Sequence, residues 1–265
     1  MKLQVLVAAM HSDPRELAEK MNLQTDALIV NQCETFAYEE FERGGRKVRC
    51  FSMAERGVGL SRNTALMRSE GDILLFSDED VRLDDGYEEK ILGAFERNPD
   101  ADLILFNVEI DPARATYHND TVHRVRWYNY GRYGTVAAAV RREALIRTGI
   151  TFSLLFGGGA KYSNGEDSLF LHDCLKRGLH LYTETASIGG ETYRESTWFR
   201  GYNDKFFFDR GVLYAYLYGP MARVWAFRYL FVKRKILCKD VPFGKAFRLM
   251  KDGIREGKNV RGERA

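Results

Sequence analysis

The stretch Ile73-Leu74-Leu75-Phe76-Ser77-Asp78-Glu79-Asp80-Val81 decides the fold, because an apolar run leads without a break into three consecutive carboxylates. A short apolar run of this kind is typical of a buried strand. Asp78 and Asp80 are two residues apart, so both can reach one Mg²⁺ or Mn²⁺ ion, which prefers oxygen ligands. The alternative is a solvated acidic turn that caps the next helix, and the stretch alone leaves both interpretations open.

Apolar runs and amphipathic stretches alternate on both sides of this strand. The alternation predicts an α/β fold with a mainly parallel sheet flanked by helices. Ligands of such sheets bind at the carboxyl ends of the strands, so the residues that follow Met10, Val30 and Phe76 are candidate site residues. Strands are predicted at residues 3–10, 26–30, 47–51, 72–76 and 102–108, and helices at 13–21, 61–68, 84–96 and 167–177.

The size and composition of the chain fit a folded enzyme-sized protein. It has 265 residues, of which 45% are hydrophobic and 29% are charged, which excludes a disordered or collagen-like chain. A net charge of +3 does not by itself indicate nucleic-acid binding. The four cysteines form no Cys-x-x-Cys pair, and no signal peptide is evident, so we expect reduced thiols in a cytoplasmic protein.

The C-terminal part of the chain differs from the rest in charge. Residues from Gly219 onward contain 13 Lys and Arg against 4 Asp and Glu, a net charge of +9, whereas the preceding residues carry −6. Aromatic residues are frequent over residues 213–232, where Pro220, Arg223 and Arg228 argue against a membrane-spanning helix. Two interpretations stay open: a helical extension that contacts the inner face of the plasma membrane, and helices that pack on the body.

A second acidic feature is Asn164-Gly165-Glu166-Asp167, at the predicted start of a helix. A carboxylate at this position can cap the helix. It can also act as a general base that takes a proton from a hydroxyl group. The spacing alone does not choose between these roles.

The stretch from Glu55 to Leu66 is a glycine-containing loop that leads into a helix, with Arg62 in the first turn. Loop amides and an arginine near a helix N-terminus suit a phosphate or a nucleotide. The stretch lacks both the Gly-x-Gly-x-x-Gly pattern of dinucleotide sites and the Gly-Lys-Ser/Thr of a phosphate loop.

Together these motifs resemble the family 2 glycosyltransferases, which have a GT-A fold. The resemblance lies in their order: a strand ending in Asn31-Gln32, Gly59-Leu60-Ser61-Arg62-Asn63, the pair Asp78 and Asp80, and Glu166-Asp167 at a helix start. It covers roughly residues 1–200, the expected catalytic domain, with residues 201–265 as an aromatic and basic helical extension. The segment that begins Glu195-Ser196-Thr197-Trp198 is similar to one found in bacterial members that build surface polysaccharides.

The resemblance implies a role for each site residue. Asn31 stands where the family often has an Asp that contacts the uracil base, and Arg62 would lie near the nucleotide. Asp78 and Asp80 would bind Mn²⁺ or Mg²⁺ and, through it, the donor diphosphate. Asp167 would be the catalytic base. Two further residues are expected to contact substrate, Glu166 beside the base and Trp198.

The activity implied is an inverting, metal-dependent transfer of a sugar from a nucleotide sugar, expected to be a UDP-sugar, to a saccharide or lipid-linked saccharide. Many members have a further metal-binding histidine, but residues 188–195 contain none, so the resemblance assigns no third protein ligand.

Two other functions are compatible with parts of the sequence. Asp78-Glu79-Asp80-Val81 after an apolar strand also resembles the motif of haloacid-dehalogenase-like phosphatases, in which the first Asp is the nucleophile. That motif normally follows the first strand, whereas here several elements precede it. A non-catalytic relative that binds nucleotide sugars or saccharides is the other alternative, against which the presence of both Asp80 and Asp167 argues.

Overall fold

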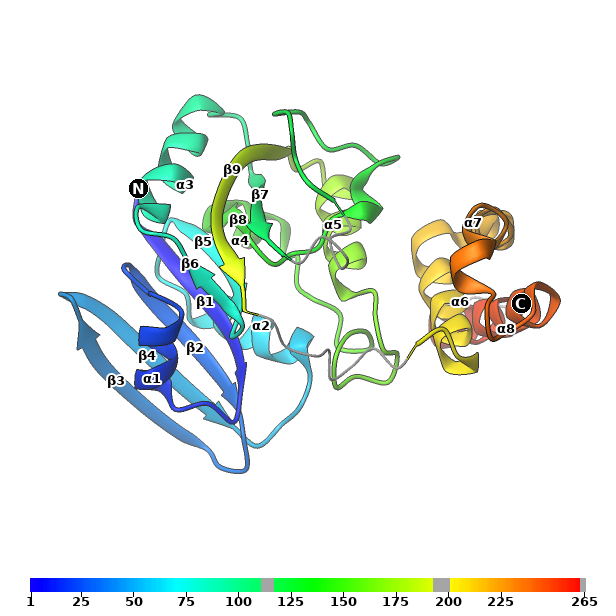
Figure 1. Cartoon of the computed structure of the whole chain (residues 1–265), viewed down its shortest axis with the longest axis horizontal. Helices are drawn as coiled ribbons and strands as arrows, with labels where there is room; N and C mark the ends of the chain where they lie inside the picture. The colour runs from blue at the N-terminus through cyan, green and yellow to red at the C-terminus, as the bar shows by residue number, and fades with distance from the viewer. Residues whose placement is uncertain (111–116, 193–200, 263–265) are drawn as a thin grey trace.

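The computed structural model describes residues 1–110, 117–192 and 201–262. Its described part contains a nine-stranded mixed sheet with helices on both faces, and three further helices that lie at the far end of the molecule (Figure 1). The strands are β1 (Leu3–Met10), β2 (Asp26–Gln32), β3 (Ala37–Arg43), β4 (Arg46–Met53), β5 (Ile73–Asp78), β6 (Val81–Leu83), β7 (Leu103–Glu109), β8 (Ala138–Arg141) and β9 (Leu181–Glu191). The helices are α1 (Pro14–Lys20), α2 (Val58–Arg68), α3 (Tyr87–Arg97), α4 (Arg142–Thr148), α5 (Glu166–Lys176), α6 (Asp204–Tyr218), α7 (Ala222–Leu237) and α8 (Phe243–Val260), with single 3-10 turns η1 (Tyr130–Arg132) and η2 (Gly219–Met221).

The centre of the sheet is parallel, as the sequence predicts. β1 pairs in parallel with β2 and β5, and β2 pairs in parallel with β4. The register places Met10 opposite Gln32 and Ala8 opposite Asp78. The carboxyl ends of β1, β2 and β5 therefore meet at one edge of the sheet, where a ligand site is expected.

Antiparallel strands extend this centre. The sheet order is β3-β4-β2-β1-β5-β8-β7-β9-β6, in which β3, β8 and β6 each pair in an antiparallel way with their neighbours. β7 and β9 form a further parallel pair. The expected α/β class is thus confirmed, in the form of a mixed sheet.

Two hydrophobic cores cover the two faces of the sheet, because successive strand residues point to opposite sides. Val5 and Val7 of β1 belong to the core that α1 and α3 cover, whereas Leu6 belongs to the core that α2, α4 and α5 cover. The helix α5, which carries the expected base, therefore packs on the same face of the sheet as α2, which carries Arg62.

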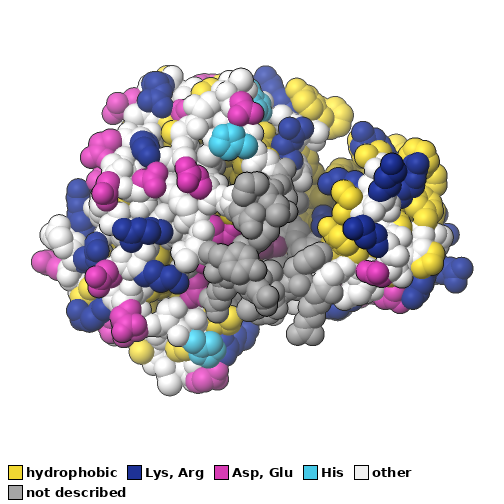
Figure 2. All heavy atoms as spheres, viewed as in Figure 1, with side chains coloured by type: hydrophobic (Ala, Val, Ile, Leu, Met, Phe, Trp, Pro, Cys, Tyr) yellow, Lys and Arg dark blue, Asp and Glu magenta, His cyan; other side chains and the backbone are white. Residues whose placement is uncertain are grey.

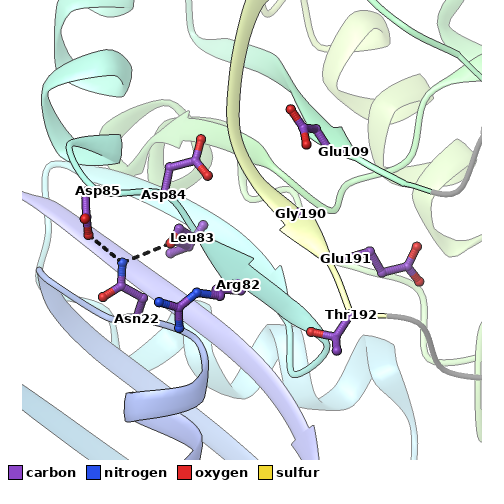
Figure 3. Close-up of a pocket in the computed structure, with 9 residues that line it drawn as sticks. All are labelled: Asn22, Arg82, Leu83, Asp84, Asp85, Glu109, Gly190, Glu191 and Thr192. Atoms are coloured by element: carbon purple, nitrogen blue, oxygen red, sulfur yellow. Dashed lines mark hydrogen bonds between the residues drawn. The ribbon is translucent and has the colours of Figure 1, made fainter.

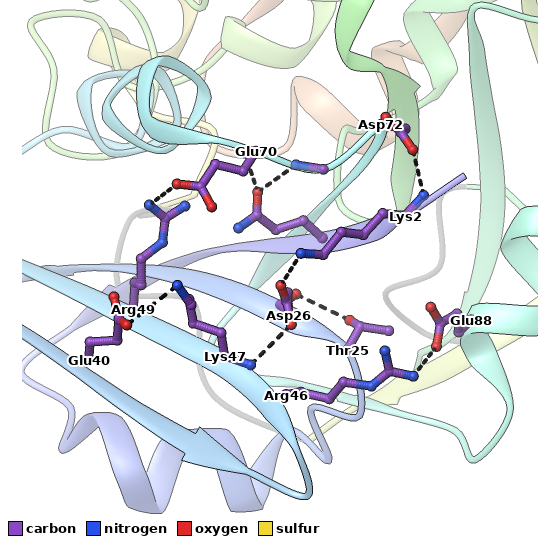
Figure 4. A network of polar contacts seen from close by, with 12 residues as sticks. Lys2, Thr25, Asp26, Glu40, Arg46, Lys47, Arg49, Glu70, Asp72 and Glu88 are labelled. Carbon is purple, nitrogen blue, oxygen red and sulfur yellow. Dashed lines mark hydrogen bonds and ion pairs between the residues drawn. The ribbon is translucent and has the colours of Figure 1, made fainter.

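An ionic network ties together the amino-terminal ends of the central strands, away from the candidate site (Figure 4). Lys2 Nζ lies 2.7 Å from Asp26 Oδ2, and the Lys2 backbone nitrogen donates to Asp72 Oδ2 at 2.7 Å. Burial opposes ionisation of Asp26, but hydrogen bonds from Lys2 and Lys47 outweigh it and lower the pKa of this carboxyl. The network fixes the relative positions of β1, β2, β4 and the turn before β5.

The helices α6, α7 and α8 share a core of their own, which includes Phe207, Leu230 and Met250. A smaller cluster joins α6 to α5 and the loop before it, where Leu213 packs with Phe156 and Leu169. None of the helices in the described part of the chain is long and apolar enough to cross a membrane.

Candidate active site

Of the three carboxylates at the end of β5, Glu79 points away from the other two. Glu79 Oε2 accepts hydrogen bonds from the Met10 backbone nitrogen at 3.0 Å and from Ser12 Oγ at 2.6 Å, so this side chain holds the end of β1. Asp78 and Asp80 instead line a cavity of about 220 Å³. The spacing of two residues thus places this pair on one side, as the sequence predicts.

The surroundings of Asp80 disfavour the ionised form of its carboxyl group. Burial, followed by the carboxylates of Asp78 and Glu191, raises the pKa of Asp80 to about 6. These carboxylates therefore repel one another, and no Lys or Arg among the described residues forms an ion pair with Asp80. A bound divalent cation would relieve this repulsion.

The residues present fit a magnesium or manganese ion that is shared with a substrate. In the described part of the chain, no three His, Cys, Asp or Glu side chains form a group that could hold a metal by themselves. Mg²⁺ is usually bound by one or two carboxylates together with substrate phosphates and waters, and Asp78 and Asp80 supply two such carboxylates. The donor set therefore suits an ion that binds together with a diphosphate.

Arg62 lies between the two acidic clusters. It is 5% exposed, and its Nη2 donates to Asp78 Oδ1 at 3.1 Å while its Nη1 donates to Asp167 Oδ1 at 2.8 Å. Burial by itself would lower the pKa of Arg62, but Asp78, Asp167 and Glu166 outweigh it and raise this pKa. The guanidinium also lies over the ring of Phe152, with its carbon 5.2 Å from the ring centroid. One fixed cation therefore connects the candidate metal ligand with the candidate base.

Asp167 is held by a second donor, which the sequence did not indicate. The buried hydroxyl of Thr135 donates a hydrogen bond to Asp167 Oδ1, the oxygen that Arg62 also contacts. Oδ2 faces Gly134, where a Cβ would lie 3.4 Å away, and no described residue donates a hydrogen bond to it. The base candidate thus has one oxygen fixed by two donors and the other open to a substrate.

Contact with the C-terminal helices positions α5, the helix that carries the candidate base Asp167. Its N-cap, Gly165, has a φ of 116°, and a Cβ there would lie 2.6 Å from Cδ2 of Leu213 in α6. Glycine is therefore required for α5 to begin at Glu166 in contact with α6. Burial, followed by the charge of Asp167, raises the pKa of Glu166 to about 7.

The cavity at Asp78 and Asp80 is also lined by residues that sequence reasoning missed. Tyr117, Gly134 and Glu191 line it together with Asp78 and Asp80. Burial, followed by the charge of Asp167, raises the pKa of Tyr117 to about 12, so the phenol keeps its proton and can donate a hydrogen bond. These residues come from separate parts of the chain and carry no local motif.

Glu191 lies between this cavity and a second, more polar one of about 440 Å³, formed around β6 and the end of β9 (Figure 3). In that cavity, Asn22 Nδ2 donates to the Leu83 carbonyl at 3.0 Å and to Asp85 Oδ1 at 2.9 Å. Figure 3 shows the Glu191 carboxylate on the side of β9 away from Asn22.

The remaining predicted residues have different outcomes. Asn31 lies at the carboxyl end of β2, and its amide exchanges two hydrogen bonds with the Ser12 backbone, at 3.1 and 2.8 Å. In this structure its side chain therefore fixes the loop that follows β1. Trp198 lies outside the described residues.

Comparison with known families decides which kind of protein this geometry belongs to. The sequence model described as glycosyl transferase family 2 matches residues 29–156. This segment belongs to glycosyl transferase family 2. The matched residues include Arg62, Asp78, Asp80 and Thr135, and the helix with Asp167 follows shortly after them. The chain is therefore a glycosyltransferase, as the motifs indicated.

Solved structures show the fold of this glycosyltransferase independently. TarS residues 1–349 from S. aureus in complex with UDP-GlcNAc has a TM-score of 0.64 at 16% identity, covering 99% of this chain and 93% of that chain. The complex of the same TarS fragment with UDP has a TM-score of 0.64 at 15% identity, covering 99% and 92%. The longer structure of TarS gives 0.57 at 15% identity, with 97% of this chain and 43% of that chain covered. No curated protein sequence matches the chain. At these identities the likeness establishes the GT-A fold.

Proposed function

We propose that this glycosyltransferase moves a sugar from a nucleoside diphosphate sugar, with UDP as the nucleotide, to a hydroxyl group of a saccharide or lipid-linked saccharide in polysaccharide biosynthesis. The observation that carries the proposal is the position of Arg62, 2.8 Å from Asp167 and 3.1 Å from Asp78. A base and a diphosphate-binding carboxylate thus lie within reach of one buried guanidinium, close enough to act on the two sides of one reacting sugar.

In the proposed reaction, Asp167 Oδ2 takes the proton of the acceptor hydroxyl as its oxygen attacks the anomeric carbon. The bond between that carbon and the diphosphate oxygen breaks, and the nucleoside diphosphate leaves with the bonding electron pair. Attack and departure occur on opposite faces, so the anomeric configuration inverts. Oδ2 is the oxygen assigned to this step because Arg62 and Thr135 both occupy Oδ1.

Asp78 and Asp80 are proposed to hold Mn²⁺ or Mg²⁺ together with the donor diphosphate. The ion supplies positive charge that stabilises the diphosphate as it leaves. Arg62 adds a fixed positive charge on the same side, and because it is buried between carboxylates it needs no reorganisation to do so.

The other residues are proposed to position substrates. Glu166, whose carboxyl is partly protonated near neutrality because burial raises its pKa to about 7, can donate a hydrogen bond to the acceptor. Asn31 stays our proposal for the uracil-contacting position and Trp198 for a substrate contact. We assign residues 1–200 to the catalytic GT-A domain and residues 201–265 to a C-terminal extension.

We place the enzyme in the cytoplasm, at the inner face of the plasma membrane, where a lipid-linked acceptor would be found. All four cysteines are free thiols, which suits a reducing compartment. The helices of the extension supply the peripheral contact.

Transfer assays with UDP-sugars and manganese test the proposal. UDP-GlcNAc is the first donor to use, since it is bound in the TarS structure of similar fold. We expect UDP release that depends on an added saccharide acceptor, and a product with inverted anomeric configuration by NMR. Donor binding without transfer across a panel of acceptors would favour a non-catalytic binding protein, and release of inorganic phosphate would favour a phosphatase.

A further inference from the structure

The outer face of α7 exposes large apolar side chains to solvent. Val224, Phe231, Val232 and Ile236 are 57%, 54%, 64% and 55% exposed. The opposite face of the helix, with Ala222, Ala226 and Leu230, is fully buried against α6 and α8. The exposed apolar residues are therefore not needed for the core of the C-terminal helices.

Cations are interleaved with these apolar residues. α7 contains five Lys and Arg and no Asp or Glu, and none of these cations forms an ion pair within the described part of the chain. Val224, Arg228, Phe231 and Lys235 follow one another at spacings of four, three and four residues, so they form one stripe along the helix. Figure 2 shows Lys and Arg side chains among hydrophobic ones over this end of the molecule.

Contacts with α8 partly fix the aromatic residues of this face. Phe227 packs edge-on against Phe243 and Phe247 of α8, with ring centroids 5.7 and 5.6 Å away, and its ring is stacked on Phe231 at 6.1 Å. The guanidinium of Arg234 lies 4.9 Å from the centroid of Phe231. The stripe is thus a preformed surface on a packed helix pair, and ordering it on contact costs little conformational entropy.

The positive charge of this face indicates which kind of partner can bind it. A second copy docked through the same stripe would bring Arg228 and Lys235 against the same two cations of its partner, on a helix without an acidic residue, which opposes self-association. A partner must therefore be anionic and must also accept scattered apolar side chains without a defined pocket. An anionic lipid surface has both properties, because phosphate headgroups lie directly above hydrocarbon.

We propose that the outer face of α7, centred on Val224, Arg228, Phe231 and Lys235, lies flat on an anionic membrane surface. The apolar side chains enter the headgroup region and the cations bind lipid phosphates. This proposal specifies the peripheral membrane contact named in the proposed function. It rests on that function only in one respect, that membrane binding would bring the enzyme to a lipid-linked acceptor. The contact itself needs neither a donor nor a metal, so it can fail or succeed independently of sugar transfer.

Vesicle co-sedimentation of the full chain tests the proposal. The probes are vesicles of phosphatidylcholine alone and of an equal mixture of phosphatidylcholine and phosphatidylglycerol, at low and high salt. We expect binding to the anionic vesicles only, weakened as salt rises because exposed charges are screened beyond about 8–10 Å at physiological ionic strength. The double variant R228E/K235E should reduce binding at least about tenfold at low salt, and V224S/F231S should abolish the part that survives high salt.

Matched controls separate this face from net charge and net hydrophobicity. K176E/R177E at the C-terminal end of α5 changes the charge equally, and M67S/I146S removes two apolar residues that are 71% and 64% exposed elsewhere. Both should bind vesicles like the unmodified chain, and all four variants should keep its melting temperature. Equal binding of the α7 variants and the unmodified chain, binding without anionic lipid, or a dimer in sedimentation velocity that V224S/F231S dissolves would each overturn the proposal.

Discussion

Replacement of Thr135 by valine tests how the proposed base, Asp167, is positioned. Valine has nearly the same shape but lacks the hydroxyl that donates to Asp167 Oδ1, and Thr135 is fully buried, so no water takes its place without rearrangement. A hydrogen bond to a charged group contributes about 1.5–3 kcal/mol, and each 1.4 kcal/mol corresponds to about tenfold in rate. Arg62 still holds the same oxygen at 2.8 Å, so we expect the lower end, a fall in kcat of about tenfold.

The assay is steady-state transfer with saturating acceptor, with kcat and the donor KM determined separately. The proposed donor site is formed by other residues, so the KM for the donor should stay unchanged. Thr135→Ser keeps the hydroxyl and should retain activity within about threefold of the unmodified enzyme. The reasoning is refuted if the valine and serine variants are equally active, or if the valine variant loses donor affinity and kcat together, as a general packing defect would cause.

Asp80→Ala should abolish manganese-dependent UDP binding measured by calorimetry, and in the unmodified enzyme that affinity should fall below about pH 6, where Asp80 becomes protonated; manganese-dependent UDP affinity that Asp80→Ala leaves unchanged would remove Asp80 from the site. Glu166→Gln should raise the melting temperature at pH 8 but not at pH 5. The fold raises the pKa of Glu166 to about 7 from an ordinary 4.5, so stability from this group is present below about pH 4.5 and is lost as pH rises through about 7, a penalty on the order of 1–3 kcal/mol that glutamine lacks. A glutamine variant that is less stable at both pH values would mean that the ionised carboxylate contributes to the fold.

Sequence reasoning identified the elements that have a clear hydrophobic pattern and that end in a functional motif. The apolar run before Asp78 and the helix after Gly165 were both predicted within a few residues, because each has a regular hydrophobic pattern and a clear boundary. The antiparallel edge strand β3 was missed, since its residues are mostly charged and exposed. A signal was available in Gly44-Gly45, where both residues have positive φ and form the tight turn into β4.

The candidate site was predictable only where a motif marks it. Asp78, Asp80 and Asp167 lie at or next to the end of a strand or the start of a helix, and the adjoining apolar pattern marks these positions in the sequence. Thr135 does not, because its role depends on a contact with a residue 32 positions away. The bridging role of Arg62 was likewise hidden, since only the packing of α2 and α5 on one face brings it to Asp167, 105 residues later. Such contacts are set by tertiary structure, and no local pattern encodes them.

The most direct measurement of the central claim is the turnover of Asp167→Asn. Asparagine keeps the shape of the side chain and can still accept a hydrogen bond from Arg62 or Thr135, but it cannot take the acceptor proton. We expect UDP-sugar affinity by calorimetry within about twofold of the unmodified enzyme and a loss of transfer of about 10²–10⁴-fold, the usual contribution of a general base. Transfer within about threefold of the unmodified enzyme on the same acceptor would show that another group removes the proton.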